Sequence, residues 1–494
     1  MRALRLGLPA VLVLAIACGL SAAADLYVSP DGKPDGDGTK ARPLDLATAL
    51  GAKSPAKAGD TVWLLGGTYR GGFTAKVAGK EGAPITFRQA PGERAVVDCR
   101  VEGKGQTLFQ VDGAWLVFWG FEVTCSDPKR ETDEKGSAPA DINRGGVNVM
   151  GSQCKFINLV VHDTAQGFGF WSSGEGGEIC GCIIYNNGWT GPDRGHGHAI
   201  YTQNKTGTKR LVDNIMFNQF CYGIHAYGSP RAFLVGYHIE GNVGFNNGAA
   251  SRPTDRHPNI LVGAGSPGER ITLLANYTYH TGLGGSVQLG YGALNKDLAL
   301  RDSYFVGGMD VRWWEKMVGS GNTFIAGHAV PVFDCAKCGD PTQYEWNKNT
   351  YLPSEKAVFS LTTKEGGKAL SFEDWQKATG LDKDSTYTVG APTGLKVFVR
   401  PNPYEPGRAN VIVYNWDKKD AVDADLKDVL KSGAKYKVMN AQDFFGKPVV
   451  EGTFDGKPVR LPMKEYRAPA PVGKPDYVAP ATGPEFNVFV VLPM

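Results

Sequence analysis

The chain repeats one short pattern between residues 154 and 327. A brief apolar segment carries an Asn or a small substitute, and a polar, Gly-rich turn and a second apolar run follow it. We match these positions at Asn158, Cys182, Asn214, Asn242, Asn276, Ser303 and Asn322, which are spaced 19 to 34 residues apart. Such a period is typical of stacked repeat folds, and units this short and Gly-rich cannot hold pairs of helices. The repeat therefore predicts the coils of a parallel β-helix, whose flat outer faces suit polymeric ligands.

Length and net charge limit the domain organisation and the partners. With 494 residues the chain exceeds a single ordinary core, so we expect a solenoid with an appended domain. The net charge is only +3, which argues against nucleic acid as a partner. We expect a monomer.

Residues 1–24 have the pattern of a secretory signal peptide, with a basic start, an apolar run over 6–17 and small residues up to Ala24. Cleavage near Ala24 is the favoured interpretation, and a lipid anchor at Cys18 is the alternative. No later apolar stretch is long enough to span a membrane as a helix. We therefore expect a secreted or periplasmic protein.

The remaining sequence predicts an all-β fold in two domains. A parallel β-helix is expected over residues 25–340, with a short amphipathic helix in 43–52 that covers its first coil. Residues 341–390 are expected to connect the domains and to contain a second short helix that ends at Gly380. Alternating apolar runs over 391–494 predict a small C-terminal β-sandwich.

The opening YVSPDG, the segment GDTVWLLGGTY and the coils after them resemble the secreted right-handed parallel β-helix proteins of the pectin-lyase-like superfamily. That group includes pectate and alginate lyases, mannuronan epimerases and polygalacturonases. The resemblance implies the fold and a polysaccharide substrate, but it does not select a reaction, because one fold supports many chemistries. The DPHE motif of the epimerases is absent, and only Gly195-His196-Gly197 is similar to a polygalacturonase motif.

Aligning the second strand of each repeat predicts which side chains share an outer face, since strand residues alternate between inside and outside. The predicted outward row is Asn148, Tyr201, His225, Leu261, Gln288 and Arg312, and a second row two residues along is Met150, Gln203, Tyr227, Gly263, Gly290 and Trp314. Aromatic rings, amides and guanidinium groups suit a sugar chain that carries carboxylates. A generic solvated sheet is the alternative, and a slip of one residue would exchange the two faces.

The segment GWTGPDRGHGHAIYTQNK, residues 188–205, concentrates reactive side chains. The chemistry that fits is proton abstraction next to a carboxylate, with a base, an acid and a cation on the carboxylate. We predict His198 or His225 as the base and Tyr201 as the acid. Arg194 or Arg312 is predicted to bind the carboxylate.

Other residues of this segment are expected to bind substrate, and alternatives stay open. Asp193 and His196 are predicted substrate-binding residues. His196 and His198 could instead form a metal pair, because alternate strand residues share a face. A purely structural role for these histidines is the other alternative.

The loop at residues 251–259 is predicted to form a second wall of the same cleft, through Asp255, Arg256 and His257. Its two prolines alone could explain it as a rigid loop. No acidic cluster in the sequence identifies a calcium site. Carboxylates from different coils could still assemble one, so Ca²⁺ stays open as a cofactor and no other is expected.

Three functions compete on these observations. The first is a polysaccharide lyase or epimerase acting on an acidic, uronate-containing glycan. The second is a glycoside hydrolase on the same scaffold, in which Asp193, Glu240 and Asp255 are the candidate acids. The third is a non-catalytic surface protein that binds glycans.

Overall fold

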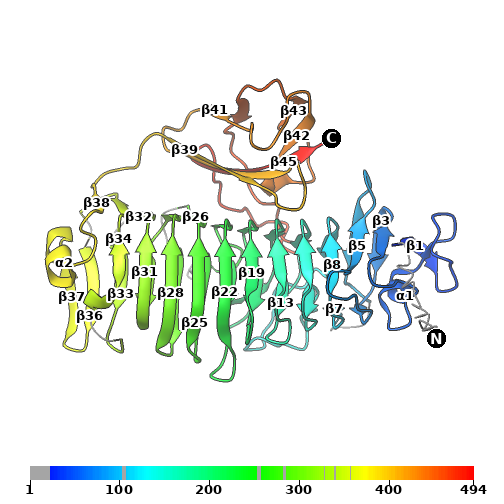
Figure 1. Cartoon of the computed structure of the whole chain (residues 1–494), viewed down its shortest axis with the longest axis horizontal. Helices are drawn as coiled ribbons and strands as arrows, with labels where there is room; N and C mark the ends of the chain where they lie inside the picture. Colours follow the sequence, from blue (N-terminus) through cyan, green and yellow to red (C-terminus); the bar gives the residue numbers. More distant parts are fainter. Residues whose placement is uncertain are drawn as a thin grey trace, which may run out of the picture.

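The computed structural model describes residues 23–494, apart from 103–106, 253–256, 282–284, 327–328, 339–340 and 357. The expected apolar leader and its alternative anchor, Cys18, lie outside the described residues. No helix in the described part of the chain is long and apolar enough to cross a membrane. The chain forms one long parallel β-helix with a second domain lying along its side (Figure 1).

Three sheets of twelve strands each form the coils, and we call them sheets A, B and C. Sheet A contains β1 (Asp25–Lys33), β2 (Thr61–Leu64), β5 (Ile85–Gln89), β8 (Leu116–Trp119), β11 (Lys155–Ile157), β14 (Glu178–Cys180), β19 (Lys209–Val212), β22 (Leu234–Glu240), β25 (Gly268–Leu274), β28 (Asn295–Arg301), β31 (Trp314–Ser320) and β34 (Glu345–Asn347).

Sheet B contains β3 (Gly67–Arg70), β6 (Ala95–Asp98), β9 (Glu122–Thr124), β12 (Val160–His162), β15 (Ile183–Tyr185), β20 (Ile215–Phe217), β23 (Val243–Phe245), β26 (Tyr277–Tyr279), β29 (Tyr304–Val306), β32 (Thr323–Ala326), β35 (Thr350–Pro353) and β38 (Thr386–Tyr387). Sheet C contains β4 (Phe73–Ala75), β7 (Phe109–Val111), β10 (Val147–Val149), β13 (Phe168–Phe170), β18 (Ile200–Thr202), β21 (Ile224–Ala226), β24 (Ile260–Ala264), β27 (Val287–Gly292), β30 (Met309–Arg312), β33 (Ala329–Asp334), β36 (Val358–Thr363) and β37 (Gly366–Leu370). Only the last pair, β36 with β37, is antiparallel.

The turn from sheet A to sheet B explains the repeated Asn of the sequence. From β8 onward this turn has two residues, of which the first has a left-handed backbone and the second points into the core. The left-handed residues are Gly120, Asn158, Gly181, Asp213, Gly241, Ala275, Asp302, Gly321 and Lys348. The inward residues are Phe121, Leu159, Cys182, Asn214, Asn242, Asn276, Ser303, Asn322 and Asn349. Gly, Asn and Asp adopt the left-handed region at low cost, which accounts for seven of these nine left-handed residues.

The inward asparagines form a ladder of hydrogen bonds from coil to coil. Asn214 donates its Nδ2 to Oδ1 of Asn242 at 2.9 Å, and Asn242 donates in the same way to Asn276 at 3.1 Å. Each Oδ1 also accepts the backbone N–H of the preceding ladder residue, as Asn242 does from Asn214 at 3.2 Å. A buried amide with all partners satisfied fixes the register between coils.

One position of the predicted repeat is wrong by a single residue. Asn158 is not in the ladder, because it takes the left-handed position and Leu159 turns inward after it. The Asn158 side chain instead faces the C-terminal domain, where it bonds Asn402 and Glu405, both at 2.8 Å.

Both ends of the β-helix are covered by the predicted short helices. Helix α1 (Leu46–Leu50) is capped by the side chain of Asp45 and buries Leu46 and Leu50 against the first coil. Helix α2 (Phe372–Thr379) ends at Gly380, whose φ is 71°, and buries Trp375 completely at the other end. The coils continue beyond the expected boundary at residue 340. Strands of all three sheets follow it, so residues 341–390 complete the β-helix rather than only connecting the domains.

The C-terminal domain contains two antiparallel sheets that fit a β-sandwich. The larger has the order β39 (Leu395–Pro401), β40 (Ala409–Asn415), β45 (Phe486–Pro493), β42 (Lys435–Asn440) and β43 (Val450–Thr453), and the smaller pairs β41 (Ala421–Ala424) with β44 (Val459–Pro462). Two short 3-10 helices, η1 (Pro341–Gln343) and η2 (Ala441–Asp443), complete the elements outside the loop hairpin described below.

This domain packs on the outer face of sheet B through aromatic rings. Tyr185, Phe217 and Phe245 stack along sheet B with ring centroids 5.1 and 4.9 Å apart. Phe486 of the domain then stacks on Tyr279 at 4.6 Å. An apolar interface of this kind covers sheet B and leaves the outer face of sheet C free of the domain.

We expect the ladder to be a main source of stability in the coils. Replacing Asn242 by Leu removes the acceptor of the backbone N–H and the Nδ2 of Asn214, and it removes the side-chain donor to the carbonyl of Leu211, at a cost of about 2–4 kcal/mol. Asn242→Ser should cost about half of that, since Ser303 already serves one coil of the same ladder. Urea denaturation measures both, and an equal loss in the two variants would contradict this assignment.

Candidate functional site

A pocket of about 500 Å³ opens on the outer face of sheet C, over β10, β13, β18 and β21. Its walls come from two connections that lead from sheet B into sheet C. One is the loop at residues 125–146, and the other contains the hairpin of β16 (Trp189–Thr190) and β17 (Gly195–His196). The lining residues are Leu108, Ser137, Arg144, Gly145, Val147, Asn148, Ala165, Gln166, Gly169, Trp171, Trp189, Arg194, His196, Gly197, His198, Tyr201, His225 and Tyr227.

Strand register sets the floor of the pocket. Asn148, Gly169, Tyr201 and His225 pair in sequence across β10, β13, β18 and β21. The prediction therefore assigned Asn148, Tyr201 and His225 to the correct face of the sheet, but it left out Gly169 of β13, which lies between Asn148 and Tyr201. Glycine at position 169 leaves space there, and Trp171 donates its Nε1–H to Oδ1 of Asn148 at 2.6 Å across that gap.

Two histidines are hydrogen-bonded to each other beside Tyr201. Nδ1 of His225 lies 3.1 Å from Nε2 of His198, and Nδ1 of His198 accepts the backbone N–H of Tyr222 at 3.3 Å. That acceptor role places the proton of neutral His198 on Nε2, where it is donated to His225. Neutral His225 then carries its own proton on Nε2.

Burial keeps both imidazoles uncharged. It lowers the pKa of His225 to about 3, and the neighbouring positive charges of His257 and Arg194 act in the same direction. Burial and the proximity of His225 lower the pKa of His198 well below its usual value. Burial also raises the pKa of Tyr201, so its hydroxyl is protonated over the neutral range. The pocket thus presents neutral rings rather than a histidine cation.

Aromatic rings surround this pair. Tyr227 stacks on His225 with centroids 4.7 Å apart, and Tyr222 lies 4.3 Å from the same ring. The predicted substrate residue Gln203 is next to them, and its Nε2 donates to the backbone carbonyl of Tyr227 at 3.5 Å. His257 contacts the edge of Tyr222 at 4.9 Å, so the loop at 251–259 does reach this cluster. Asp255 and Arg256 lie outside the described residues.

His196 and His198 face different neighbours, because Gly197 between them has a φ of 91° that breaks the strand alternation. Nε2 of His196 lies 3.0 Å from Oδ1 of Asp193, and its ring stacks flat on Trp189 at 5.0 Å. The hydrogen bond from His196 and the charge of Arg194 outweigh desolvation and lower the pKa of Asp193 to about 2. Asp193 is thus a carboxylate that holds the hairpin, not a general acid.

Arg144 lines the pocket and was not among the predicted residues. It is half-buried, and no ion pair to it occurs within the described part of the chain. Arg194, which was predicted to bind a carboxylate, already pairs with Asp193 at 2.9 Å. The sequence signal for Arg144 is weak, since it lies in a long loop outside the repeats.

The charged side chains that line the pocket are all positive. Two arginines line it, and none of its described lining residues is a carboxylate. Nε1 of Trp189 is also buried there without a partner among the described residues. No three His, Cys, Asp or Glu side chains in the described ranges gather in a way that could hold a metal ion. The pocket offers hydrogen-bond donors and positive charge, which suit an anionic ligand.

Three predicted residues lie away from the pocket. Gln288 continues the row two coils beyond His225, where it pairs in register with Asp310 rather than with Arg312. Arg312 falls two residues later and binds Asp310. Trp314 is fully buried at the start of β31, so its prediction as a substrate residue is wrong.

Two further side chains have structural roles. Glu240 is in sheet A and bonds Arg400 of the C-terminal domain at 2.8 Å, which removes it from the candidate acids. Lys209 is buried beneath the pocket, where its Nζ donates to the carbonyls of Phe170, Trp171 and Gln203 at 3.2, 2.8 and 2.7 Å. It therefore fixes the backbone that carries Trp171 and Gln203.

Comparison with known proteins agrees with this fold. Residues 26–258 match the family described as Pel9A-like, right handed beta helix region. Pectate lyase L of Thermoclostridium stercorarium is 24% identical over 295 residues, which are 48% of this chain and 22% of that protein. Pectate lyase PEL9 of Emericella nidulans is 40% identical over 78 residues, 15% of this chain and 18% of that protein.

The chain thus spans less than a quarter of the length of either relative. Among solved structures, pectate lyase Pel9A aligns with a TM-score of 0.42 and 19% identity, over 65% of this chain and 79% of that chain. The family match over residues 26–258 agrees with the pectin-lyase-like resemblance of the sequence.

The histidine pair makes folding stability depend on pH in a defined direction. The pKa of His225 is about 3 in the folded chain and near 6.5 in an unfolded one, so the unfolded state binds more protons between these values. This contribution is fully present above pH 6.5 and is lost as the pH falls towards 3. Between pH 7 and pH 5 we expect His225 alone to account for a loss of about 2 kcal/mol. Urea denaturation of the wild type and of His225→Gln at both pH values measures it, and equal slopes in the two proteins would contradict the assignment.

Proposed function

We propose that this pectin-lyase-like protein, with its Pel9A-like β-helix region, is an exported enzyme that cleaves an acidic, uronate-containing polysaccharide by β-elimination. The observation that carries the proposal is the charge of the sheet C pocket, which has Arg144 and Arg194 in its lining and no carboxylate among its described lining residues. Hydrolysis by the common mechanism needs two carboxyl groups at the bond. Elimination needs instead a cation on the uronate carboxylate, a base and an acid.

Arg144 is assigned to the substrate carboxylate. Its guanidinium has no ion-pair partner in the described structure, whereas that of Arg194 is engaged by Asp193 and Ser137. A bidentate contact between guanidinium and carboxylate withdraws charge from the carboxylate and makes the adjacent C5 proton more acidic. Trp171, Tyr201 and Tyr227 flank this position and offer rings to the sugar faces.

Tyr201 and His225 are assigned to proton transfer. The Tyr201 hydroxyl is protonated at neutral pH and donates to the leaving oxygen. His225 accepts the C5 proton at Nε2 from its other neutral tautomer, in which its single ring proton is on Nδ1 and is donated to Nε2 of His198. Reaching that state moves one proton from Nε2 to Nδ1 on each imidazole, through solvent, and His198 gives up the contact that its Nδ1 accepts from the Tyr222 N–H. A bound uronate anion favours the protonated imidazole and so opposes the effect of burial on its pKa.

The test of the reaction is an activity assay on a panel of uronate polysaccharides, with ultraviolet absorbance of unsaturated chain ends as the signal. Arg144→Ala should lower kcat/KM by about 10- to 100-fold, since it removes a charged hydrogen bond in a desolvated site. Arg144→Lys should keep part of the activity, and Arg231→Ala, an exposed arginine outside the pocket, should leave it unchanged.

Reducing ends without unsaturation would contradict elimination and favour a hydrolase. Binding of the polymers without turnover would favour a non-catalytic glycan-binding protein. Equal effects of Arg144→Ala and Arg231→Ala would remove Arg144 from the site.

The pH profile tests the state of the histidines. Because the pKa values of His198 and His225 are lowered, kcat/KM should be level between pH 5 and pH 8 rather than fall below pH 6.5. His225→Gln retains a hydrogen-bond donor but cannot accept the proton, so it should lower kcat by about 100-fold or more. An acid limb near pH 6.5 would contradict neutral histidines, and full activity of His225→Gln would assign the base elsewhere.

A further inference from the structure

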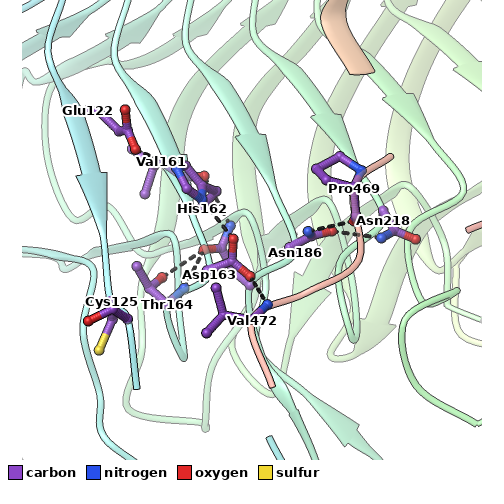
Figure 2. A network of polar contacts seen from close by, with 12 residues as sticks. Glu122, Cys125, Val161, His162, Asp163, Thr164, Asn186, Asn218, Pro469 and Val472 are labelled. Atoms are coloured by element: carbon purple, nitrogen blue, oxygen red, sulfur yellow. Dashed lines mark hydrogen bonds and ion pairs between the residues drawn. The ribbon is translucent and has the colours of Figure 1, made fainter. Parts of the chain in front are cut away.

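A long segment of the C-terminal domain between β44 and β45 leaves the sandwich and lies against the β-helix (Figure 1). We call its residues 469–474 the strap. Figure 2 shows how the strap is attached. The carbonyl of Pro469 accepts Nδ2 of Asn186 at 2.9 Å, and the N–H of Val472 bonds Oδ1 of Asp163 at 2.7 Å. Both partners are left-handed residues at the turns from sheet B towards sheet C.

Arg130 joins the strap to the first pocket loop. Its side chain is only 3% exposed, although it carries a charge. Nε donates to the carbonyl of Val472 at 3.2 Å, and Nη2 donates to the carbonyls of Cys125 and Asp163. A buried guanidinium is stable only while its donors are satisfied, so the strap and this loop hold each other in place.

The backbone of the same loop continues the connection into the pocket wall. The N–H of Thr190 bonds the carbonyl of Arg130 at 2.8 Å, and the N–H of Thr132 bonds the carbonyl of Thr190 at 3.2 Å. Thr190 belongs to β16, which pairs with β17, and there Trp189 stacks on His196. Residues 130–132 are thus joined to the hairpin that lines the pocket by a parallel β-bridge between Glu131 and Thr190.

The C-terminal end of the strap contacts the backbone of the loop at 125–146. Gly473 has a φ of 84°, and a Cβ placed on it would lie 1.7 Å from the carbonyl oxygen of Pro128. Next to it, Nζ of Lys474 pairs with Glu131 at 3.2 Å. Only a glycine permits this close approach of the two backbones.

We propose that the strap is a positioning element of the catalytic site, through which the C-terminal domain fixes the loop at 125–146 and the β16–β17 hairpin. The loop carries Arg144 and Ser137, and the hairpin carries Arg194, so the strap sets the separation of the two arginines in the pocket. This inference rests on the proposed function for its catalytic consequence. Its structural part, the restraint of the two walls, stands on the contacts alone.

The experiment compares Gly473→Ala with Gly456→Ala in the full-length protein. Both glycines have a φ of 84°, so both variants bear the same backbone strain, but a Cβ at Gly456 meets nothing within 4 Å. Gly473→Ala should increase amide hydrogen exchange in residues 128–146 and 188–197, and Gly456→Ala should not. On a uronate polymer that the wild type cleaves, Gly473→Ala should lower kcat/KM on the order of tenfold, mainly through KM, when both variants are assayed below their unfolding midpoints.

The outcomes separate the two proposals. Faster exchange in both wall segments with unchanged kinetics would overturn the positioning role and leave the proposed function intact. Unchanged exchange in Gly473→Ala would overturn the restraint itself. If the wild type cleaves no uronate polymer, the proposed function fails, while the exchange comparison still decides whether the strap holds the walls.

Discussion

The two-residue turn between sheets A and B is the constraint on which the rest of the molecule depends. A left-handed residue reverses the chain and the next residue turns inward, where an Asn binds the Asn of the neighbouring coil, as Asn214 binds Asn242. Because this turn has no spare residue, each coil is stacked on the last in a fixed register. The rows of side chains on sheets B and C inherit that register, including the alignment of Tyr201 with His225.

The connections between sheets B and C vary in length from coil to coil, and two of the longer ones form the walls of the pocket. The connections from sheet B to sheet C range from residues 307–308 to the long loop 125–146, and the connection 186–199 contains a hairpin. The turn between sheets A and B is fixed in length, whereas the connection between sheets B and C can lengthen. A coil can therefore add a loop that forms a pocket wall without disturbing the core. Sheet B cannot serve in the same way, because the C-terminal domain covers it. The pocket therefore lies on sheet C, whose strands are held in a fixed register and whose outer face is not covered by the C-terminal domain.

Much of this could be read from the sequence, and the errors have physical causes. The repeated Asn gave the fold, and strand alternation gave the neighbours Tyr201 and His225. The strand β13 was missed in the outward row because its outward position is Gly169, which has no side chain to give a polar signal. Trp314 was misplaced because a strand pattern cannot tell where one sheet ends and the next begins. Arg144 was missed because its role depends on how a loop of irregular length folds over the sheet, which no periodicity encodes.

The charge pattern of the pocket links these features to chemistry. Two carboxylates near the pocket are already engaged, since Asp193 pairs with Arg194 and Asp163 accepts the N–H of Val472 in the strap. Burial keeps His198 and His225 neutral, so the net positive charge comes from arginine and does not change over the physiological pH range. A site of this kind attracts a polyanion by charge and aligns it by aromatic contacts, while neutral groups exchange protons. Arg144 is the side chain best suited to bind an anionic group of such a ligand, because it is charged, lines the pocket and has no ion-pair partner in the described structure.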